Sequence, residues 1–401
     1  MATKKIYFEP SGRLHPAHRE LVRRPPKGYE FVLQNTRWDK AMNIGVGSDF
    51  IYRKLYFGLR RTFPLNLMPF HLLKLWLEQF SKRPPTGTDL TYSYNHVIFR
   101  KEPWVVQVEY PVFLVGLHAG LLHRWRPVVE RRLASRWCKK ILCWSEVAKK
   151  SLLVNLDHRL IQDKVQIIPL SVSPKAFTKT YDAERIKLFF VGSGSEPRRF
   201  REKGGKEVLE AFLLLTKKYD HLELVIRCDV PPNVKRTCEG LPNVKLMEKL
   251  VPWEKLEQEF KTADIFLLPT LFPGQDMAIL DAMSYELPVI TTSYGANSEM
   301  VKDGITGFVV PSSGRIPEYD EDLNPAELSA LASRYYRAIK TTDYRVVEGI
   351  VDKASMLIED LHLRERMGRA GRREVEEGQF SIGNTNTKLG RVLDEATADT
   401  P

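Results

Sequence analysis

Short apolar segments alternate with amphipathic stretches along most of this chain of 401 residues. The apolar segments of the first half are near-continuous runs of β-branched and aromatic residues, which is typical of parallel strands buried on both faces. We expect strands at 4–10, 29–34, 88–94, 103–110, 139–145 and 165–172, with helices at 69–80 and 128–138. This alternation predicts an α/β domain with a parallel sheet.

A polar stretch without periodicity, 173–186, predicts a hinge, and a second α/β series follows it. The pattern predicts an α/β fold of two tandem Rossmann-like doubly wound domains that face a cleft, where ligands would bind at the carboxyl ends of the strands. The predicted boundaries are 1–172, 173–186 for the hinge, 187–378, and 379–401 for a closing helix that crosses back, with a tail. The expected elements of the second series are strands at 187–192, 222–228, 264–270 and 288–293, helices at 205–219, 253–263 and 277–286, and a largely helical end at 325–396.

Composition agrees with two ordinary domains, because a hydrophobic content of 43% and a charged content of 28% are usual for a globular protein. The four cysteines show no CxxC spacing, which indicates free thiols in a reducing compartment. We find no apolar run long enough for a signal peptide or a membrane span. The expected location is therefore the cytoplasm.

Charge is divided unevenly along the chain. Residues 1–170 hold 29 Lys and Arg against 13 Asp and Glu, a net +16, while 171–401 hold 32 against 37, a net −5; together these make the +11 of the whole chain. The basic half indicates an anionic partner. A nucleic acid is not expected, because no RNA- or DNA-binding motif is visible. An amphipathic segment with basic ends at 60–83 suits the inner face of an anionic membrane, and equally an ordinary core helix.

Three segments of the second half carry candidate chemistry. The first, 189–212, follows a strand with a polar loop that holds Arg198, Arg199 and Lys203 before a helix expected to begin near Gly204–Gly205. Arginine suits bidentate phosphate contacts and lysine a point contact, and a helix start adds free N–H groups. The same residues also fit a solvated basic loop.

The second segment reads "DIFLLPTLFPGQDMAILDAMSYE" from residue 264, and predicts a strand, a loop and a helix. Gly274 would let the backbone approach a ligand closely. The helix start near Asp276 would offer N–H groups to an anion, although by propensity Asp276 is more readily an N-cap. Asp281 faces the ligand if the helix start does, and is otherwise a solvated helix residue.

The third segment, 291–311, is a strand, a small-residue loop with Gly295, a short helix with Glu299, and turn signals at 303–307. The acidic run at 318–322 beyond it is expected to be a solvated surface loop.

The order and spacing of these segments resemble the retaining glycosyltransferases of family 4, which have the GT-B fold. The resemblance extends over roughly 140–395, and includes "ILCWSEVAKKSL", "ILDAMSYELPVI" and "LRERMGRAGRREV". One departure is clear, because Pro273 stands where the family has the first of two acids, and Asp281 stands where it has the second. The resemblance implies an N-terminal acceptor-binding domain and a C-terminal nucleotide-sugar domain.

The resemblance implies a set of catalytic residues and a set of donor-binding residues. Glu109 and Asp276 are the candidates for catalysis, since Asp276 could replace the acid absent at Pro273 and Glu109 ends a strand of the first domain. His15 and His96 are expected to be structural or acceptor-side. The expected donor-binding residues are Gly12, Arg198, Arg199, Lys203, Gly274, Gln275, Asp276, Met277, Ala278, Asp281 and Glu299.

The predicted function is transfer of a sugar, with retention, from a UDP- or GDP-sugar to a hydroxyl of a glycan or lipid-linked acceptor. No cofactor is expected beyond the nucleotide-sugar co-substrate. No metal site is expected either, because no ligand cluster with suitable spacing is visible and the arginines, the lysine and a helix start would stabilise the leaving diphosphate. The alternative is a catalytically inactive GT-B protein that binds a sugar nucleotide or a partner enzyme, which Pro273 motivates.

Overall fold

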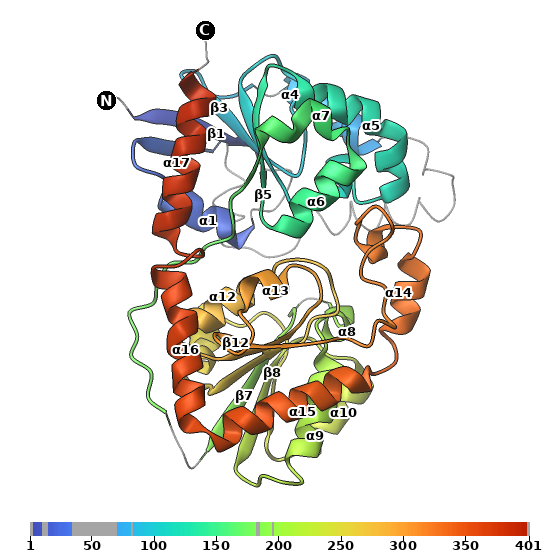
Figure 1. Ribbon diagram of the computed structural model, residues 1–401, viewed down its shortest axis with the longest axis vertical. Helices are drawn as coiled ribbons and strands as arrows, with labels where there is room; N and C mark the ends of the chain where they lie inside the picture. The colour runs from blue at the N-terminus through green and yellow to red at the C-terminus, as the bar shows by residue number, and fades with distance from the viewer. Residues whose placement is uncertain are drawn as a thin grey trace. The chain divides into compact units, whose positions relative to one another are not determined.

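A computed structural model describes residues 3–9, 15–33, 70–81, 83–181, 185–194 and 196–398 (Figure 1). The chain forms two compact units. Unit 1 comprises Met1–Pro169, Tyr319–Ala330 and Thr385–Pro401, and unit 2 comprises Leu170–Glu318 and Leu331–Asn384. Gly12 and residues 60–69 and 82 of the amphipathic segment 60–83 lie outside the described residues.

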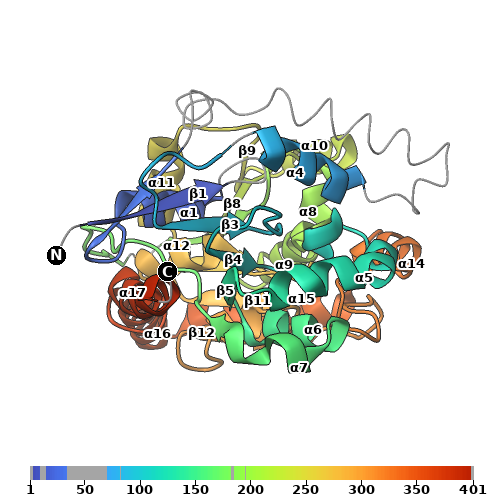
Figure 2. The same ribbon diagram turned by 90° about the horizontal axis from the view of Figure 1, so that it is seen from above.

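Unit 1 contains a parallel sheet of six strands in the order β2-β1-β3-β4-β5-β6, several of which are seen side by side in Figure 2. Because β1 pairs with β2 on one side and β3 on the other, the chain changes direction between β1 and β3. The strands are β1 (Lys4–Glu9), β2 (Tyr29–Val32), β3 (Leu90–Tyr94), β4 (Trp104–Val108), β5 (Cys138–Cys143) and β6 (Val165–Ile167).

Helices cover both faces of this sheet. α1 (Pro16–Arg23) and the last helix, α17 (Ile382–Ala398), pack through residues such as Leu21, Leu389 and Leu393 on one face. The other face lies under α4 (Phe70–Ser81), α5 (Ala119–Ala134) and α6 (Glu146–Asn155). Short helices complete the unit: η2 (Pro111–Val115), α7 (His158–Ile161), η3 (Gln162–Lys164) and η4 (Ala326–Leu328).

Unit 2 contains a second parallel sheet, in the order β12-β11-β10-β7-β8-β9. The chain fills one half of the sheet from β7 outward and then returns to β10, which pairs directly with β7. The loop after β7 and the loop after β10 therefore lead to opposite halves of the sheet, and the point between these two strands is a topological switch point. The strands are β7 (Ile186–Val191), β8 (Leu222–Arg227), β9 (Val244–Met247), β10 (Ile265–Leu268), β11 (Val289–Thr292) and β12 (Gly307–Val310).

The strands of unit 2 are parallel, so crossover connections that contain the helices join them. α9 (Gly205–Leu215) packs against α15 (Tyr344–Glu359), while α12 (Met277–Ser284) packs against α16 (Leu361–Glu376) (Figure 1). The remaining helices are α8 (Arg198–Glu202), α10 (Pro232–Glu239), α11 (Trp253–Thr262), α13 (Asn297–Met300) and α14 (Ala332–Ala338). None of the described helices is long and apolar enough to cross a bilayer.

The predicted fold class, two doubly wound α/β domains in tandem, is confirmed by the two sheets. Some element predictions were wrong in detail. The helix expected at 128–138 begins earlier, at Ala119, and ends at Ala134. The polar loop after β7 contains the short helix α8, and β9 and α10 were not anticipated, because β9 has only intermediate and exposed positions that give no apolar run.

The described residues of the polar stretch 173–186 are attached to unit 2. The Arg372 guanidinium donates hydrogen bonds to the carbonyls of Phe177 and Lys175, and the Lys179 ammonium donates to those of Lys261 and Ala263. Burial lowers the pKa of Lys179 to about 8. Backbone carbonyls therefore replace water around these two cations.

Two helical glycines of unit 2 test how tightly its layers pack. A Cβ on Gly368, in α16, would lie 2.1 Å from the Glu286 carbonyl oxygen, whereas one on Gly383, in α17, would meet nothing within 4 Å. We expect Gly368→Ala to lower the free energy of unfolding by about 1–3 kcal/mol, because α16 must move away from the turn between α12 and β11 that holds Glu286. The control Gly383→Ala should be neutral or slightly stabilising. Denaturant unfolding of both variants checks this, and equal effects would contradict it.

Candidate functional site

The loops that follow β7 and β10 are fastened to each other at the switch point of unit 2. The Leu271 amide donates to the Glu202 carbonyl over 2.8 Å, and the Thr270 hydroxyl reaches the same oxygen over 3.3 Å. Gly204 has a positive φ of 74°, and a Cβ there would lie 2.1 Å from the Pro269 carbonyl oxygen. The turn from α8 into α9 therefore requires glycine at this close approach.

Lys203 and Asp276 form an ion pair between these two loops, in which the lysine Nζ contacts Asp276 Oδ1. Both side chains are only 15% exposed. Asp276 occupies the N-cap position of α12, but its side chain makes no capping hydrogen bond. The N-cap position favoured by propensity is therefore confirmed, but the side-chain cap is not formed, because the carboxylate binds an ammonium group instead of the helix amides.

The two predicted arginines lie beside Lys203 on α8. Arg198 and Arg199 both pair with the buried carboxylate of Glu202, at 3.3 and 3.0 Å. The Phe272 ring lies under the guanidinium of Arg199 and the ammonium of Lys203, with centroid distances of 4.9 and 5.5 Å. Such cation–π contacts hold two positive charges near one another, which by itself favours an anion.

Backbone atoms of the neighbouring loop, after β11, close one side of this arrangement. Gly295 has a φ of 63°, and a Cβ there would lie 2.7 Å from the Gly274 nitrogen and 2.9 Å from the Pro273 Cα. The buried Pro273 offers no hydrogen-bonding group through its side chain. Two glycine-containing loops therefore pack backbone to backbone at the carboxyl ends of β10 and β11.

Glu318 was expected to be solvated with the rest of the acidic run 318–322, and for this residue the prediction was wrong. Its Oε1 accepts a hydrogen bond from the Gly295 amide. Burial raises the pKa of Glu318, against the opposing effect of the Gly295 N–H. The preceding Ile316 is 3% exposed and draws the segment inward. A single apolar residue in a polar run was the signal that could have indicated this.

The other predicted donor-binding residues lie along the same edge. Gln275 precedes α12, and Met277 and Ala278 form its first turn, where backbone amides have no partner within the helix. Asp281 is on the second turn of α12, close enough to the Tyr285 hydroxyl to help raise its pKa. Glu299 lies in α13. Their roles as ligand contacts stay predictions.

Sequence reasoning missed a further set of contacts at this edge, at the ends of β8 and β9. The Arg227 guanidinium donates to the Gly192 carbonyl over 3.0 Å, and the Lys249 amide donates to Asp229 Oδ1 over 2.7 Å. A Cβ on Gly194 would lie 2.5 Å from the Lys249 carbonyl oxygen. The loops after β7, β8 and β9 are thus joined, which only the strand order reveals.

In unit 1, Glu109 directly follows β4, as predicted from the end of its apolar run. Its carboxylate accepts a hydrogen bond from the Tyr94 hydroxyl over 3.1 Å, and its amide donates to Asn95 Oδ1 over 2.9 Å. Burial, with help from Glu109, raises the pKa of Tyr94 well above its usual value. Tyr94 therefore stays protonated and orients the carboxylate.

The two histidines expected to be structural or acceptor-side lie in unit 1 as well. The His15 ring lies tilted against Trp144, with ring centroids 5.0 Å apart, and its Nδ1 accepts from the Ala17 amide at the start of α1. Burial lowers the pKa of His15 to about 4. His96 lies 3.8 Å from Glu9 and bonds the Tyr94 carbonyl.

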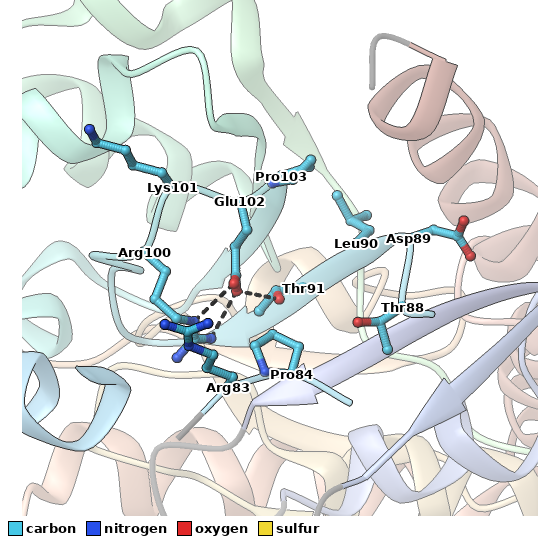
Figure 3. A pocket seen from close by; sticks show the side chains of 10 residues that line it. All are labelled: Arg83, Pro84, Thr88, Asp89, Leu90, Thr91, Arg100, Lys101, Glu102 and Pro103. Atoms are coloured by element: carbon cyan, nitrogen blue, oxygen red, sulfur yellow. Dashed lines mark hydrogen bonds and ion pairs between the residues drawn. The ribbon is translucent and has the colours of Figure 1, made fainter. Parts of the chain in front are cut away.

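Figure 3 shows a pocket of about 490 Å³ in unit 1, at the amino ends of β3 and β4. Three of its polar side chains contact one another: Glu102 binds Arg100 at 2.9 Å and accepts from the Thr91 hydroxyl at 2.7 Å. Ligands of doubly wound sheets bind at the opposite, carboxyl, ends of the strands. This pocket is therefore distinct from the candidate site. In the described part of the chain, no three His, Cys, Asp or Glu side chains gather as a metal site.

Sequence comparison relates unit 2 to a known family. Residues 182–322 match the family model described as glycosyl transferases group 1. The amylovoran biosynthesis glycosyltransferase AmsK of Erwinia amylovora is 23% identical over 227 residues, which cover 49% of this chain and 54% of that protein. The chain spans about half the length of the curated relatives it matches. The predicted resemblance to these glycosyltransferases is confirmed.

Two solved structures share the fold. A glycosyltransferase from Rickettsia africae ESF-5 matches with a TM-score of 0.59 at 13% identity, and the whole of both chains is covered. Anabaena Alr3699/HepE, solved with UDP and glucose, matches with a TM-score of 0.57 at 12% identity over 98% of this chain and 99% of that one. The predicted GT-B fold is confirmed, while family 4, retention and the cleft stay predictions.

The ion pair at the switch point makes a prediction about anion binding. In Asp276→Asn the ammonium of Lys203 loses a competing carboxylate, so we expect pyrophosphate and UDP to bind more tightly, by about 1 kcal/mol or roughly fivefold. Isothermal titration calorimetry measures this. Asp220→Asn is the control, because it removes the same charge from a fully exposed site at the amino edge of the sheet. Unchanged or weaker binding to Asp276→Asn would contradict the prediction.

Proposed function

We propose that this protein is a glycosyltransferase that moves a sugar, with retention, from a nucleotide-diphosphate sugar to a hydroxyl of a glycan or lipid-linked acceptor. The observation that carries the proposal is the joining of Lys203, Arg199 and the start of α12 at the switch point of unit 2. Anionic groups bind at such points and at helix starts. The relation of residues 182–322 to glycosyl transferases group 1 agrees with it.

A diphosphate fits this arrangement in charge and in geometry. The Lys203 ammonium would bind a phosphate oxygen in place of the Asp276 carboxylate. Arg199, which contacts Phe272 and Glu202, supplies a second cation. The first turn of α12 offers backbone N–H groups to the same anion. UDP and GDP donors both satisfy this chemistry, and the UDP bound in the similarly folded HepE favours testing uridine first.

In the proposed reaction, the bond between the sugar's anomeric carbon and the diphosphate oxygen breaks, and the acceptor hydroxyl oxygen forms the new bond on the same face. The hydroxyl proton passes to the departing diphosphate, and a nucleoside diphosphate is released. Lys203, Arg199 and the amides of α12 would stabilise the negative charge that develops on the leaving oxygen. These groups supply what a divalent cation would otherwise supply, so we propose a metal-independent reaction.

Two carboxylates are candidates for contact with the reacting groups. Asp276, once released from Lys203, can accept hydrogen bonds from sugar hydroxyls. Glu109, oriented by Tyr94 and Asn95, can accept one from the sugar or the acceptor. We propose both for these roles.

The proposal predicts that removal of Lys203 lowers turnover. In Lys203→Ala, we expect donor hydrolysis or transfer to fall at least about tenfold, because one cation is lost beside the leaving diphosphate. The donor is found first with a thermal-shift panel of UDP-, GDP-, ADP- and TDP-sugars. The matched control is Lys217→Ala, an exposed lysine beyond the end of α9.

Turnover of Lys203→Ala equal to that of the wild type would contradict the proposal. If the wild type binds a sugar nucleotide but consumes no donor with a broad acceptor panel, the protein is instead a non-catalytic GT-B protein. The buried Pro273 favours that alternative.

We also propose that unit 1 binds an anionic membrane surface through α4. Leu73, Trp76, Leu77 and Phe80 are 50%, 47%, 53% and 80% exposed and lie at helical spacing along one face, while Leu72 and Leu75 are buried on the other. The Trp76 and Phe80 rings stack with centroids 5.9 Å apart. A helix that is apolar on both faces within a strongly basic half suits an interface that is apolar and negatively charged.

Liposome flotation tests the membrane proposal. We expect the wild type to float with vesicles of phosphatidylglycerol and phosphatidylcholine but not with phosphatidylcholine alone, and the double variant Trp76→Ser/Phe80→Ser to lose most of this binding. The matched control is Val154→Ser/Leu160→Ser, which removes exposed apolar side chains from α6 and α7. Equal flotation of the two variants, or no flotation of the wild type, would contradict the membrane proposal.

A further inference from the structure

The carboxylate of Glu318 is held in a fixed place against the site. Its Oε1 accepts a hydrogen bond from the Gly295 amide. The preceding residue, Pro317, is fixed as well, because its carbonyl accepts a hydrogen bond from the Tyr294 hydroxyl. Tyr294 is 1% exposed and Ile316 is 3% exposed. Glu318 is thus positioned by a buried aromatic residue and a buried aliphatic one, and not by its acidic neighbours.

The Glu318 carboxylate lies near the 273–276 loop, which carries Asp276 of the ion pair at its far end. Gly295, which binds Glu318, packs on the backbone of Pro273 and Gly274. Two residues after Gly274, Asp276 meets Lys203. A ligand whose diphosphate contacts Lys203 and the start of α12 could therefore reach Glu318 by extending its neighbouring group along the 273–276 loop.

The chemical character of Glu318 is suited to a neutral, hydroxyl-rich group. Among the described residues, no Lys, Arg or His side chain forms an ion pair with the Glu318 carboxylate, and burial raises its pKa. A half-buried carboxylate without a cation repels phosphate, but accepts strong hydrogen bonds from hydroxyl groups. Pro273 has no polar side-chain atom, and Asp276 accepts such hydrogen bonds only after it leaves Lys203, so Glu318 is the carboxylate here that makes no ion pair in the described part of the structure.

We propose that Glu318 binds hydroxyl groups of the donor's sugar and so helps to determine which donor sugars are accepted. This inference rests on the proposed function, because in a nucleotide-diphosphate sugar the sugar ring is joined directly to the diphosphate. Glu318 is a residue of donor specificity that neither its acidic surroundings nor its place in the sequence suggests. Its present hydrogen bond to Gly295 keeps one oxygen fixed, so that the other can face the ligand.

The substitution Glu318→Gln separates this role from a structural one. The side-chain amide oxygen of glutamine can still accept the Gly295 N–H, whereas the negative charge is gone. Affinities for UDP, UDP-glucose, UDP-galactose, GDP and GDP-mannose are measured by calorimetry for wild type and variant. We expect the affinity for UDP or GDP alone to be unchanged, and the affinity for the preferred sugar form to fall about ten- to a hundredfold.

Glu321→Gln is the matched control, because it removes the same charge from an exposed position three residues further along the acidic run. It should change neither affinity. An equal loss of affinity for UDP and UDP-glucose, or a lowered Tm of Glu318→Gln, would overturn the inference in favour of a purely structural carboxylate. Unchanged affinity for the sugar forms would overturn it as well.

The failure of the inference and that of the proposed function give different results. If the wild type binds none of these nucleotides, the proposed function fails, and the inference fails with it. If the wild type prefers one sugar nucleotide and Glu318→Gln keeps the same preference, only the role of Glu318 is refuted.

Discussion

The ion pair between Lys203 and Asp276 joins the two loops on which the candidate site depends. Those loops follow β7 and β10, strands that are far apart in sequence and adjacent in the sheet. A parallel sheet has all its carboxyl ends at one edge, so this adjacency brings a lysine and an aspartate together 73 residues apart. In the absence of ligand, the aspartate neutralises a cation that would otherwise lie beside the Arg199 guanidinium. The same pairing makes the site responsive to an anion, which must compete with one carboxylate.

Much of this could be predicted from residue patterns, and the reason is burial. Strands such as β7 and β10 are largely buried, so their sequences are near-continuous apolar runs that are recognised without a structure. The edge strand β9 has no buried residue, and its short sequence was not recognised as a strand. The order of the strands was beyond the reach of local patterns, and with it the contact of Arg227 with the loop after β7. Local signals predict elements, while the site is made by pairing between them.

The two carboxylates of the site illustrate the same limit in opposite ways. Asp276 stands where propensity favours an N-cap, yet its carboxylate contacts a lysine from another loop and makes no capping hydrogen bond. Glu318 stands in a run that predicts solvent exposure, yet Ile316 and Tyr294 fix its segment against Gly295. In both cases a tertiary contact decides the role of the side chain, because a charged group finds a partner that its sequence neighbours cannot supply.

The charges of the site also fall into two separate parts, and this division argues for a ligand with an anionic and a neutral portion. Arg199 and Lys203 lie on α8 and at its end, whereas Glu318 lies beyond the 273–276 loop without a cation. A nucleoside triphosphate would place another phosphate against that carboxylate, at a cost that burial increases. A sugar in the same position carries no charge and offers hydroxyl donors. The arrangement therefore favours a diphosphate that bears a sugar over one that bears a third phosphate.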